Sequence, residues 1–115
     1  MALEWKITSF ESLSVHELYD ILRLRSEIFV VEQNCVYLDM DNKDQKALHL
    51  FGTFEGKIVA HARLFKPGIS FVHASIGRVT VDAKHREKKW GHELMRQAIA
   101  GVLHHYGETE ITIGA

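Results

Sequence analysis

The chain has 115 residues, of which 46% are hydrophobic and 25% are charged, and its formal net charge at pH 7 is -1. This length and composition predict one globular domain that buries an apolar core. The small net charge argues against a general nucleic-acid-binding protein, the apolar runs are too short to cross a membrane, and the first residues lack the layout of a secretory signal peptide, so we expect a cytoplasmic protein.

The amino-terminal part of the chain predicts a short strand and then a helix. Apolar and polar residues alternate over residues 3–7, as they do in a half-buried strand. Ser14 and Glu17 have the spacing of a capping box, and apolar residues follow at helical intervals. We therefore expect a helix over residues 14–29, followed by a shorter helical or irregular segment.

Residues 38–45 form an acidic stretch that contains Asp39, Asp41 and Asp44. An EF-hand calcium loop would need an oxygen-bearing side chain where Lys43 stands and a glycine where Asp44 stands. The pattern does not fit, so we expect a solvated loop without calcium.

The middle of the chain predicts three antiparallel strands. Residues 47–54 and 57–65 are β-rich and are joined at Glu55-Gly56, which is typical of a hairpin. A third strand is expected over residues 71–81, after a proline–glycine turn. Strict alternation would divide the second strand between two faces, with Ile58, Ala60, Ala62 and Leu64 on one and Val59, His61, Arg63 and Phe65 on the other.

Residues 76–103 predict a strand, a short basic turn and a helix. The first N–H groups of such a helix lack intrahelical partners, and the helix dipole adds positive charge there, so the turn suits a phosphate group. Neither the P-loop nor the dinucleotide-binding fingerprint is present. A last strand is expected over residues 110–115. The helix has apolar residues at helical spacing that we expect in the core, namely Leu94, Met95, Ala98, Ile99, Val102 and Leu103.

The basic turn, Arg86-Glu87-Lys88-Lys89-Trp90-Gly91, resembles the Arg/Gln-x-x-Gly-x-Gly/Ala signature of the GNAT superfamily of N-acetyltransferases, whose loop wraps the pyrophosphate of acetyl-coenzyme A. Lys89 replaces the first glycine of that signature, which restricts positive φ and adds a cation. Further motifs resemble the ElaA-like branch of the superfamily: Phe29-Val30-Val31-Glu32-Gln33-Asn34-Cys35 with Tyr37, Asp39 and Asp41, then Ile76-Gly77-Arg78-Val79, Gly91 with Leu94-Met95, and Gly114-Ala115.

The resemblance implies an α/β fold with a mixed, mainly antiparallel sheet flanked by helices. Residues 1–115 would form a single, carboxyl-terminally partial N-acetyltransferase domain, because the family domain continues past Gly114-Ala115 into a further helix and a pair of strands. In many members a tyrosine of that helix protonates the departing thiolate, and we expect no residue here to take its role. The last strand would present an unpaired edge, which favours a homodimer.

The resemblance also implies the reaction and its residues. An acetyl group would pass from acetyl-coenzyme A to a primary amine, in a small molecule or a peptide, by direct attack of the amine. Phe29, Glu32 and Gln33 would border the acceptor, and Glu32 would attract the amine or act as its base, or would be an ordinary surface carboxylate. The implied cofactor-binding residues are Val79, Thr80 and Val81 for the pantetheine arm, and Arg86, Glu87, Lys88, Lys89, Trp90, Gly91 and His92 for the pyrophosphate.

Two other functions fit the residues less closely. The chain could be a truncated coenzyme A binding or interaction module without turnover. Nucleic-acid binding through residues 84–89 is weaker, because a short charge run is usually a solvated turn. Trp90 is expected to be a core residue, and Arg63 and Arg78 are expected to pair with carboxylates.

Histidine and cysteine chemistry does not add a site. His104 and His105 are adjacent and point to different sides of a helix, and no ligand spacing completes them, so we expect no metal. Cys35 is the only cysteine, which excludes an internal disulfide and favours a buried or half-buried thiol over a nucleophile. The sequence offers no physical reason for one regularity, a twelve-residue spacing of His49, His61, His73 and His85.

Overall fold

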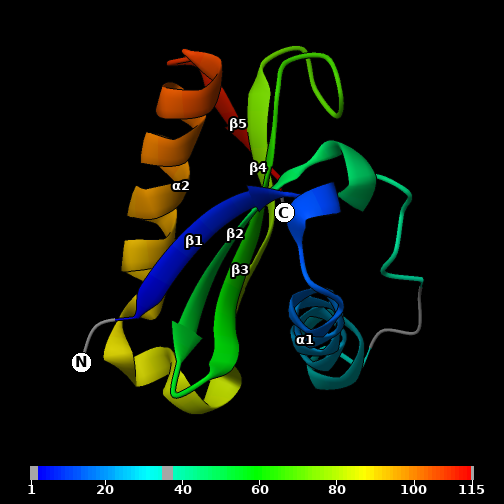
Figure 1. Ribbon diagram of the computed structural model, residues 1–115, viewed down its shortest axis with the longest axis vertical. Coiled ribbons are helices and arrows are strands. Elements are labelled where there is room, and N and C mark those ends of the chain that lie inside the picture. The colour runs from blue at the N-terminus through cyan, green and yellow to red at the C-terminus, as the bar shows by residue number, and fades with distance from the viewer. Residues whose placement is uncertain (1–2, 35–37, 115) are drawn as a thin grey trace.

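The computed structural model describes residues 3–34 and 38–114, and only the backbone of residues 85–87. In this part of the chain one sheet has the strand order β1-β2-β3-β4-β5, with α1 and α2 on its two opposite faces (Figure 1). Neighbouring strands are antiparallel except β4 and β5, which are parallel. The predicted mixed, mainly antiparallel sheet between helices is confirmed. The elements are β1 (Glu4–Ser9), α1 (Val15–Arg25), β2 (Leu48–Phe54), β3 (Lys57–Phe65), β4 (Ala74–Val81), α2 (Trp90–Tyr106) and β5 (Ile111–Ile113).

The first helix begins at the predicted capping box. Ser14 Oγ accepts a hydrogen bond from Glu17 N at 3.0 Å, and Glu17 Oε1 accepts one from Ser14 N at 2.9 Å. The α-helix ends earlier than predicted, at Arg25, and the chain continues in a π-helical segment, Ser26–Glu32, whose turns are wider. No helix of the described ranges is both long and apolar enough to cross a membrane.

The sheet face toward α2 carries an aliphatic core, in which Leu94, Ala98 and Val102 of the helix are fully buried. Ile99 and Leu103 were predicted in this core but are 48% and 53% exposed. Each directly follows a buried residue, Ala98 or Val102, and lies on a ridge of the helix that turns away from the sheet. The predicted apolar stripe was therefore too wide.

The predicted hairpin is confirmed, but it contains one extra residue. Glu55 and Gly56 both have positive φ, 51° and 79°, as a two-residue turn matched to the sheet twist requires. Gly52 pairs with Ala60 and Thr53 pairs with Ile58, so Val59 is an unpaired bulge residue. The predicted faces of Ile58 and Val59 were wrong, because Ile58 packs on the α1 side and Val59 joins the core on the α2 side.

The third and the last strands are shorter than predicted. β4 begins at Ala74 rather than at Phe71, and β5 covers only Ile111–Ile113. The difference at the start of β4 arises because Gly68 N donates to Phe71 O at 2.8 Å and closes the preceding loop on itself. The predicted state of the Cys35 thiol lies outside the described residues.

Candidate functional site

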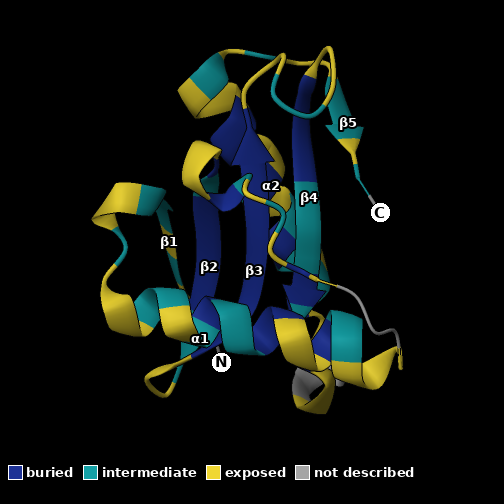
Figure 2. Ribbon diagram, turned by 90° about the vertical axis from the view of Figure 1, so that its right-hand side faces the viewer, coloured by how far each residue is buried: buried dark blue, intermediate teal, exposed yellow. Residues whose placement is uncertain are grey.

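The pairing of β5 with β4 covers only the first part of β4. The register runs from Ala74 to Ile76, and the last bond is donated by Gly114 N to Ile76 O at 2.8 Å. Beyond that point β4 continues without β5 alongside it (Figure 2). The second half of β4 is therefore an open strand edge within the described fold.

This open edge begins at a β-bulge. On its other side β4 pairs with β3, and the register jumps from Gly77 opposite Arg63 to Thr80 opposite His61. Two β4 residues, Arg78 and Val79, thus oppose one residue of β3. Arg78 has φ 49°, in the left-handed region, which costs free energy for a residue with a side chain and is often found at functional sites.

The hydrogen bonds of β4 show which backbone groups face outward. Asp82 N donates to Val59 O on β3 at 2.8 Å. Backbone groups alternate in direction along a strand, so Thr80 also faces β3, while Val79 and Val81 turn their N–H and C=O groups to the open edge. The predicted set Val79, Thr80 and Val81 therefore divides, because Thr80 is buried and its hydroxyl donates to Arg78 O at 2.7 Å.

A tight turn connects the open edge to the start of α2. The 3₁₀ segment Ala83–Lys88 is followed by Lys89, with φ 61° and ψ 25°, and α2 begins at Trp90. The lysine takes the left-handed conformation that the glycine of the signature would adopt more easily, so the substitution adds strain without changing the shape of the turn. Its own side chain does not cap the helix, so it leaves the first helical N–H groups available.

The predicted pyrophosphate residues all lie on this turn. The ring of Trp90 is buried as predicted, and its centroid lies 5.2 Å from that of the Phe54 ring. A Cβ at Gly91 would lie 3.9 Å from Val81 Cγ2, which shows that the first turn of α2 packs beside the end of β4. Lys88, Lys89 and His92 are exposed, and the side chains of Arg86 and Glu87 lie outside the described residues.

The predicted acceptor residues lie on the π-helical segment and at its end. Phe29 is half-buried, and its ring lies 5.9 Å from the guanidinium carbon of Arg78 on the β4 bulge. The structure thus brings Phe29 to the open edge. Glu32 and Gln33 lie at the exposed end of the segment, where Glu32 has an interaction partner of its own.

The acidic stretch is a buried ionic network and not the predicted solvated loop. We call residues 38–44 the aspartate loop. Arg78 contacts Asp39 through Nε, at 3.0 Å from Oδ1, and through Nη2, at 2.9 Å from the main-chain oxygen. The prediction failed because it considered the aspartates without their partners, whereas three arginines from α1, β3 and β4 meet there.

The other two arginines complete the network. Arg25 is fully buried and contacts the carboxylates of Asp39, at 2.9 Å, and of Asp44. Arg63 binds both carboxylate oxygens of Asp41, at 2.8 and 2.9 Å, and this hydrogen bonding holds the pKa of Asp41 well below its usual range although burial opposes it. The predicted pairing of Arg63 and Arg78 with carboxylates is confirmed.

Two buried histidines extend the network and explain part of the twelve-residue spacing. His49 Nε2 lies 2.8 Å from Asp44 O, which can only accept, so Nε2 carries the proton. His49 Nδ1 then accepts from His61 Nε2 at 3.0 Å. Burial lowers the pKa of both imidazoles, so both are neutral, and His61 Nδ1 has no hydrogen-bond partner in the described structure.

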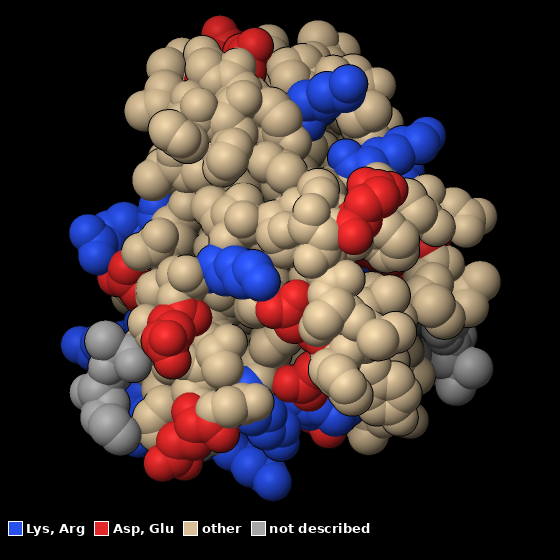
Figure 3. Space-filling model, in the orientation of Figure 1, with Lys and Arg blue, Asp and Glu red and all other residues tan. Residues whose placement is uncertain are grey.

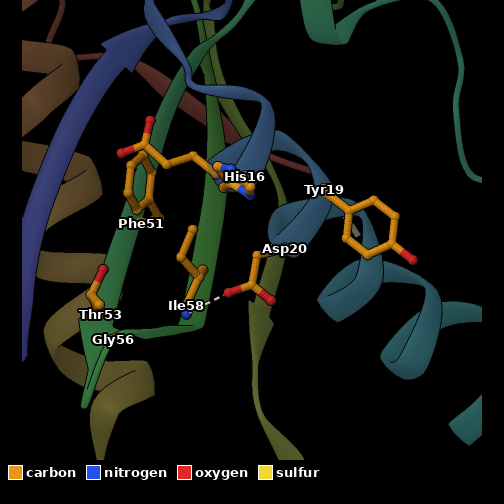
Figure 4. Close-up of a pocket in the computed structure, with 8 residues that line it drawn as sticks. His16, Tyr19, Asp20, Phe51, Thr53, Gly56 and Ile58 are labelled. Carbon is orange, nitrogen blue, oxygen red and sulfur yellow. Dashed lines mark hydrogen bonds between the residues drawn. The ribbon is translucent and has the colours of Figure 1, made fainter.

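We describe two of the hollows that open on the α1 side of the sheet. The hairpin hollow, of about 410 Å³, lies between α1 and the β2–β3 hairpin (Figure 4). Its carboxylates already have partners, because Asp20 Oδ2 accepts from Ile58 N at 2.8 Å and Glu17 pairs with Lys6 at 3.0 Å. These groups hold the helix to the sheet, and the hollow lies away from the open edge.

The second hollow, of about 210 Å³, lies at the β4 bulge. We call it the Gly77 hollow, and its lining includes Lys43, Arg63, Ser75, Gly77, Arg78 and Gly114. It therefore adjoins the point where β5 leaves β4. On the face shown in Figure 3, charges of both signs are interspersed, so no extended basic surface for nucleic acid is present on that face.

Comparison with known proteins identifies the family to which this chain belongs. The model of the acetyltransferase (GNAT) family matches residues 14–114. The chain therefore belongs to the GNAT acetyltransferase family.

Similar proteins place it more closely within the family. Protein ElaA of Escherichia coli is 36% identical over 115 residues, which cover 98% of this chain and 75% of that protein, and its crystal structure superposes with a TM-score of 0.91 over 98% of this chain and 78% of that one. An acyl-CoA N-acyltransferase from Pseudomonas aeruginosa is 33% identical, with a TM-score of 0.92 over 99% of this chain and 80% of that one. The chain lies in the ElaA-like branch.

Sequence reasoning did not predict that the aspartate loop supplies the carboxylates for Arg25, Arg63 and Arg78, and it missed the Gly77 hollow. A pattern for the pairing was present, since three aspartates fall within six residues and each arginine lies on a predicted strand or helix. What it lacked was the spatial order of those elements.

Proposed function

We propose that the protein is an acetyl-coenzyme A dependent N-acetyltransferase that moves the acetyl group to a primary amine by direct attack. The observation that carries this proposal is the open edge of β4. Val79 and Val81 offer backbone donors and acceptors there, beside the bulge and in line with the start of α2. The pantetheine arm of the co-substrate carries amide groups that match such an edge.

The start of α2 would hold the pyrophosphate. The backbone N–H groups of Trp90, Gly91 and His92 belong to the first helical turn, which carries the positive end of the helix dipole. Lys88 and Lys89 are exposed beside it and add charge. This turn fits an anionic group through its backbone, which is why its unusual lysine is compatible with the role.

The residues around the bulge would then carry the transfer. The amine nitrogen, freed of its ammonium proton, attacks the thioester carbonyl carbon, and the C–S bond breaks with its electron pair going to sulfur. The leaving thiolate takes up the second proton, which the nitrogen loses as the amide forms. The N–H group of Val79 at the open edge would stabilise the developing negative charge on the carbonyl oxygen. Phe29 borders the acceptor, and Glu32 and Gln33 lie at the end of the same segment, where Glu32 would draw in the ammonium form and accept its proton.

A pair of substitutions at Gly91 tests the proposal. Gly91→Pro removes one N–H from the first turn, and Gly91→Ala keeps that N–H and adds a Cβ in ordinary contact with Val81. A hydrogen bond to a charged group is worth about 1.5–3 kcal/mol, so the proline variant should bind acetyl-coenzyme A roughly 10–100-fold more weakly in calorimetry, whereas the alanine variant should bind like the parent.

Folding is checked by the thermal midpoint and the circular dichroism of each variant. Equal binding by the two variants, or no binding by the folded parent, would contradict the proposal. Binding without thiol release across a panel of amines would instead favour the non-catalytic coenzyme A binding module.

A further inference from the structure

We propose that the Gly77 hollow binds a carboxylate group of the acceptor, so that the substrates are amines that also carry a carboxylate, as amino acids do. This inference rests on the proposed acetyl transfer and specifies its acceptor. Its basis is the position, shape and charge of the hollow.

The hollow lies where an acceptor must lie. Gly77 pairs with Arg63 on β3 and directly precedes the bulge residues Arg78 and Val79. The open edge of β4 starts at the same place, because Gly114 is both the last residue bonded to β4 and part of the lining. A molecule in the hollow is therefore adjacent to the backbone at which the thioester is proposed to react.

Glycine at position 77 creates the space. A Cβ built on Gly77 would meet no atom within 4 Å, and the residue has no positive φ that would require glycine. The backbone conformation thus permits a side chain, and the absence of one leaves the floor of the hollow open. Phe65 and Phe71 add aromatic walls, so the space suits a small organic group and not only water.

The charges around the hollow leave one cation uncompensated. In the ionic network Arg25, Arg63 and Arg78 balance the three aspartates, and Asp41, the one carboxylate in the lining, is bound at both oxygens by Arg63. Lys43 is the further charge. Its backbone N donates to Asp41 Oδ1 at 3.1 Å, which fixes the residue at the rim, and its ammonium has no ion-pair partner among the described residues.

Two lining residues also hold polar atoms without partners. Arg63 Nε and Ser75 Oγ are buried and make no hydrogen bond in the described structure. Buried donors are nearly always satisfied in folded proteins, so unpaired donors in the wall of a charged hollow indicate a bound acceptor group or ordered water. An anion with planar oxygen acceptors satisfies both requirements, the net positive charge and the spare donors.

The first experiment compares acceptors that differ only in the carboxylate. With acetyl-coenzyme A saturating, thiol release is measured for amino acids, for their carboxamides and for the amines that lack the group altogether. We expect kcat/KM to be at least about tenfold higher for the carboxylates, the effect of one charge-assisted hydrogen bond. Faster reaction of the carboxamides or of the plain amines would overturn the inference.

Two lysine variants test whether the preference for acceptors with a carboxylate comes from the Gly77 hollow. Lys43→Gln should reduce the carboxylate-to-carboxamide ratio about tenfold, whereas Lys46→Gln, a neutralised lysine on the exposed surface nearby, should leave the ratio unchanged. Gly77→Val should fill the hollow and raise KM for the acceptor without changing the affinity for acetyl-coenzyme A. An unchanged ratio in Lys43→Gln would overturn the inference.

A binding measurement separates this inference from the proposed function. N-acetylglycine, which has the chemistry of the expected product, is titrated into the protein while backbone amide NMR shifts are followed. The amides of Lys43 and Gly77 should shift in the parent and not in Lys43→Gln, whether or not any amine is turned over. Absence of these shifts at millimolar ligand would overturn the inference, while loss of acetyl-coenzyme A binding alone would count only against the acetyl transfer.

Discussion

The two faces of the sheet are stabilised in different ways. Toward α2 the strands present aliphatic side chains, such as Leu50, Leu64 and Ile76, that pack on one ridge of the helix. Toward α1 the same strands present His49, His61 and Arg63, all buried. The first face depends on area removed from water, and the second combines a smaller apolar cluster with buried ion pairs and hydrogen bonds.

The two faces therefore differ in the substitutions that they tolerate and in what they hold in place. An aliphatic core accepts swaps that conserve volume, because no contact in it has a required partner. The ionic network connects α1, β3, β4 and the aspartate loop through specific ion pairs, so it fixes the backbone of the bulge at Arg78 relative to α1. The apolar face supports the fold, and the polar face positions the candidate site.

The largest effect should follow from opening the ionic network at Arg25. Arg25→Met keeps much of the volume but leaves the buried carboxylates of Asp39 and Asp44 without their shared cation. Breaking a buried ion pair from one side costs about 3–5 kcal/mol, so the free energy of unfolding in urea should fall by about that amount. A matched control is Arg96→Ala, which removes an exposed i,i+3 pair with Glu93 and should leave the free energy of unfolding almost unchanged, because solvent screens such a pair. Similar losses in both variants would mean that the two kinds of ion pair do not differ.

A smaller effect is expected from crowding the aliphatic face at Gly52. A Cβ there would lie 2.8 Å from Leu3 Cδ1 and 2.9 Å from Trp5 Cζ3, closer than carbon atoms pack. Gly52→Ala should therefore cost about 1–3 kcal/mol in urea unfolding, the usual range for overpacking. Gly77→Ala is the control on the other face, because its Cβ has open space and a glycine in a strand is itself unfavourable, so stability should hold or rise. A neutral result at Gly52 would show that β1 shifts to make room.

The smallest effect should be a pH dependence that belongs to the polar face. Burial lowers the pKa of His49 and His61, so the unfolded chain binds more protons than the folded one below the unfolded histidine pKa of about 6.5. Stability should thus be complete above about pH 6.5 and decline as the pH falls toward 5, a window in which Asp41 stays ionised in both states. Urea unfolding at several pH values measures how the free energy of unfolding changes with pH.

Variants of two histidines test whether the buried histidine pair causes this pH dependence of stability. His61→Phe should flatten it between pH 5 and 6.5, because one of the two buried imidazoles no longer titrates. His104→Gln removes an exposed histidine on α2 and should leave the slope as it was. A slope that survives in His61→Phe would place its origin outside the histidine pair.

The apolar face was largely predictable from the sequence. Periodicity located the strands and both helices, and the spacing of Ser14 and Glu17 identified the first turn of α1. It failed at Ile58 and Val59, because alternation assumes a regular strand, and at Ile99 and Leu103, because helical spacing alone does not tell how much of a stripe the sheet covers. Both errors come from contacts between elements, which periodicity within one element does not show.

The polar face was predictable only in part. Arg63 and Arg78 were expected to pair with carboxylates, yet the aspartates that receive them were assigned to solvent. Ion pairing depends on three-dimensional proximity and has no period along a chain, so the letters show the charges without their partners. The turn proposed to hold the cofactor was located from the sequence pattern and the family resemblance. The backbone directions of β4, which set Thr80 apart from Val79 and Val81, required the strand register.

The extra residue in the hairpin has a consequence for how this chain tolerates insertions and deletions. Removing Val59 would place Ile58 directly before Ala60 and restore a regular ladder, so every other side chain of the hairpin would keep its face. The deletion would remove the buried Val59 side chain and the carbonyl that accepts a hydrogen bond from Asp82 N at 2.8 Å. Asp82 would lose this anchor, and its carboxylate in turn accepts from Lys84 N at 3.0 Å. The extra residue of the β2–β3 hairpin therefore serves the turn that follows β4 more than the hairpin. That turn contacts β3 on the edge opposite to β2.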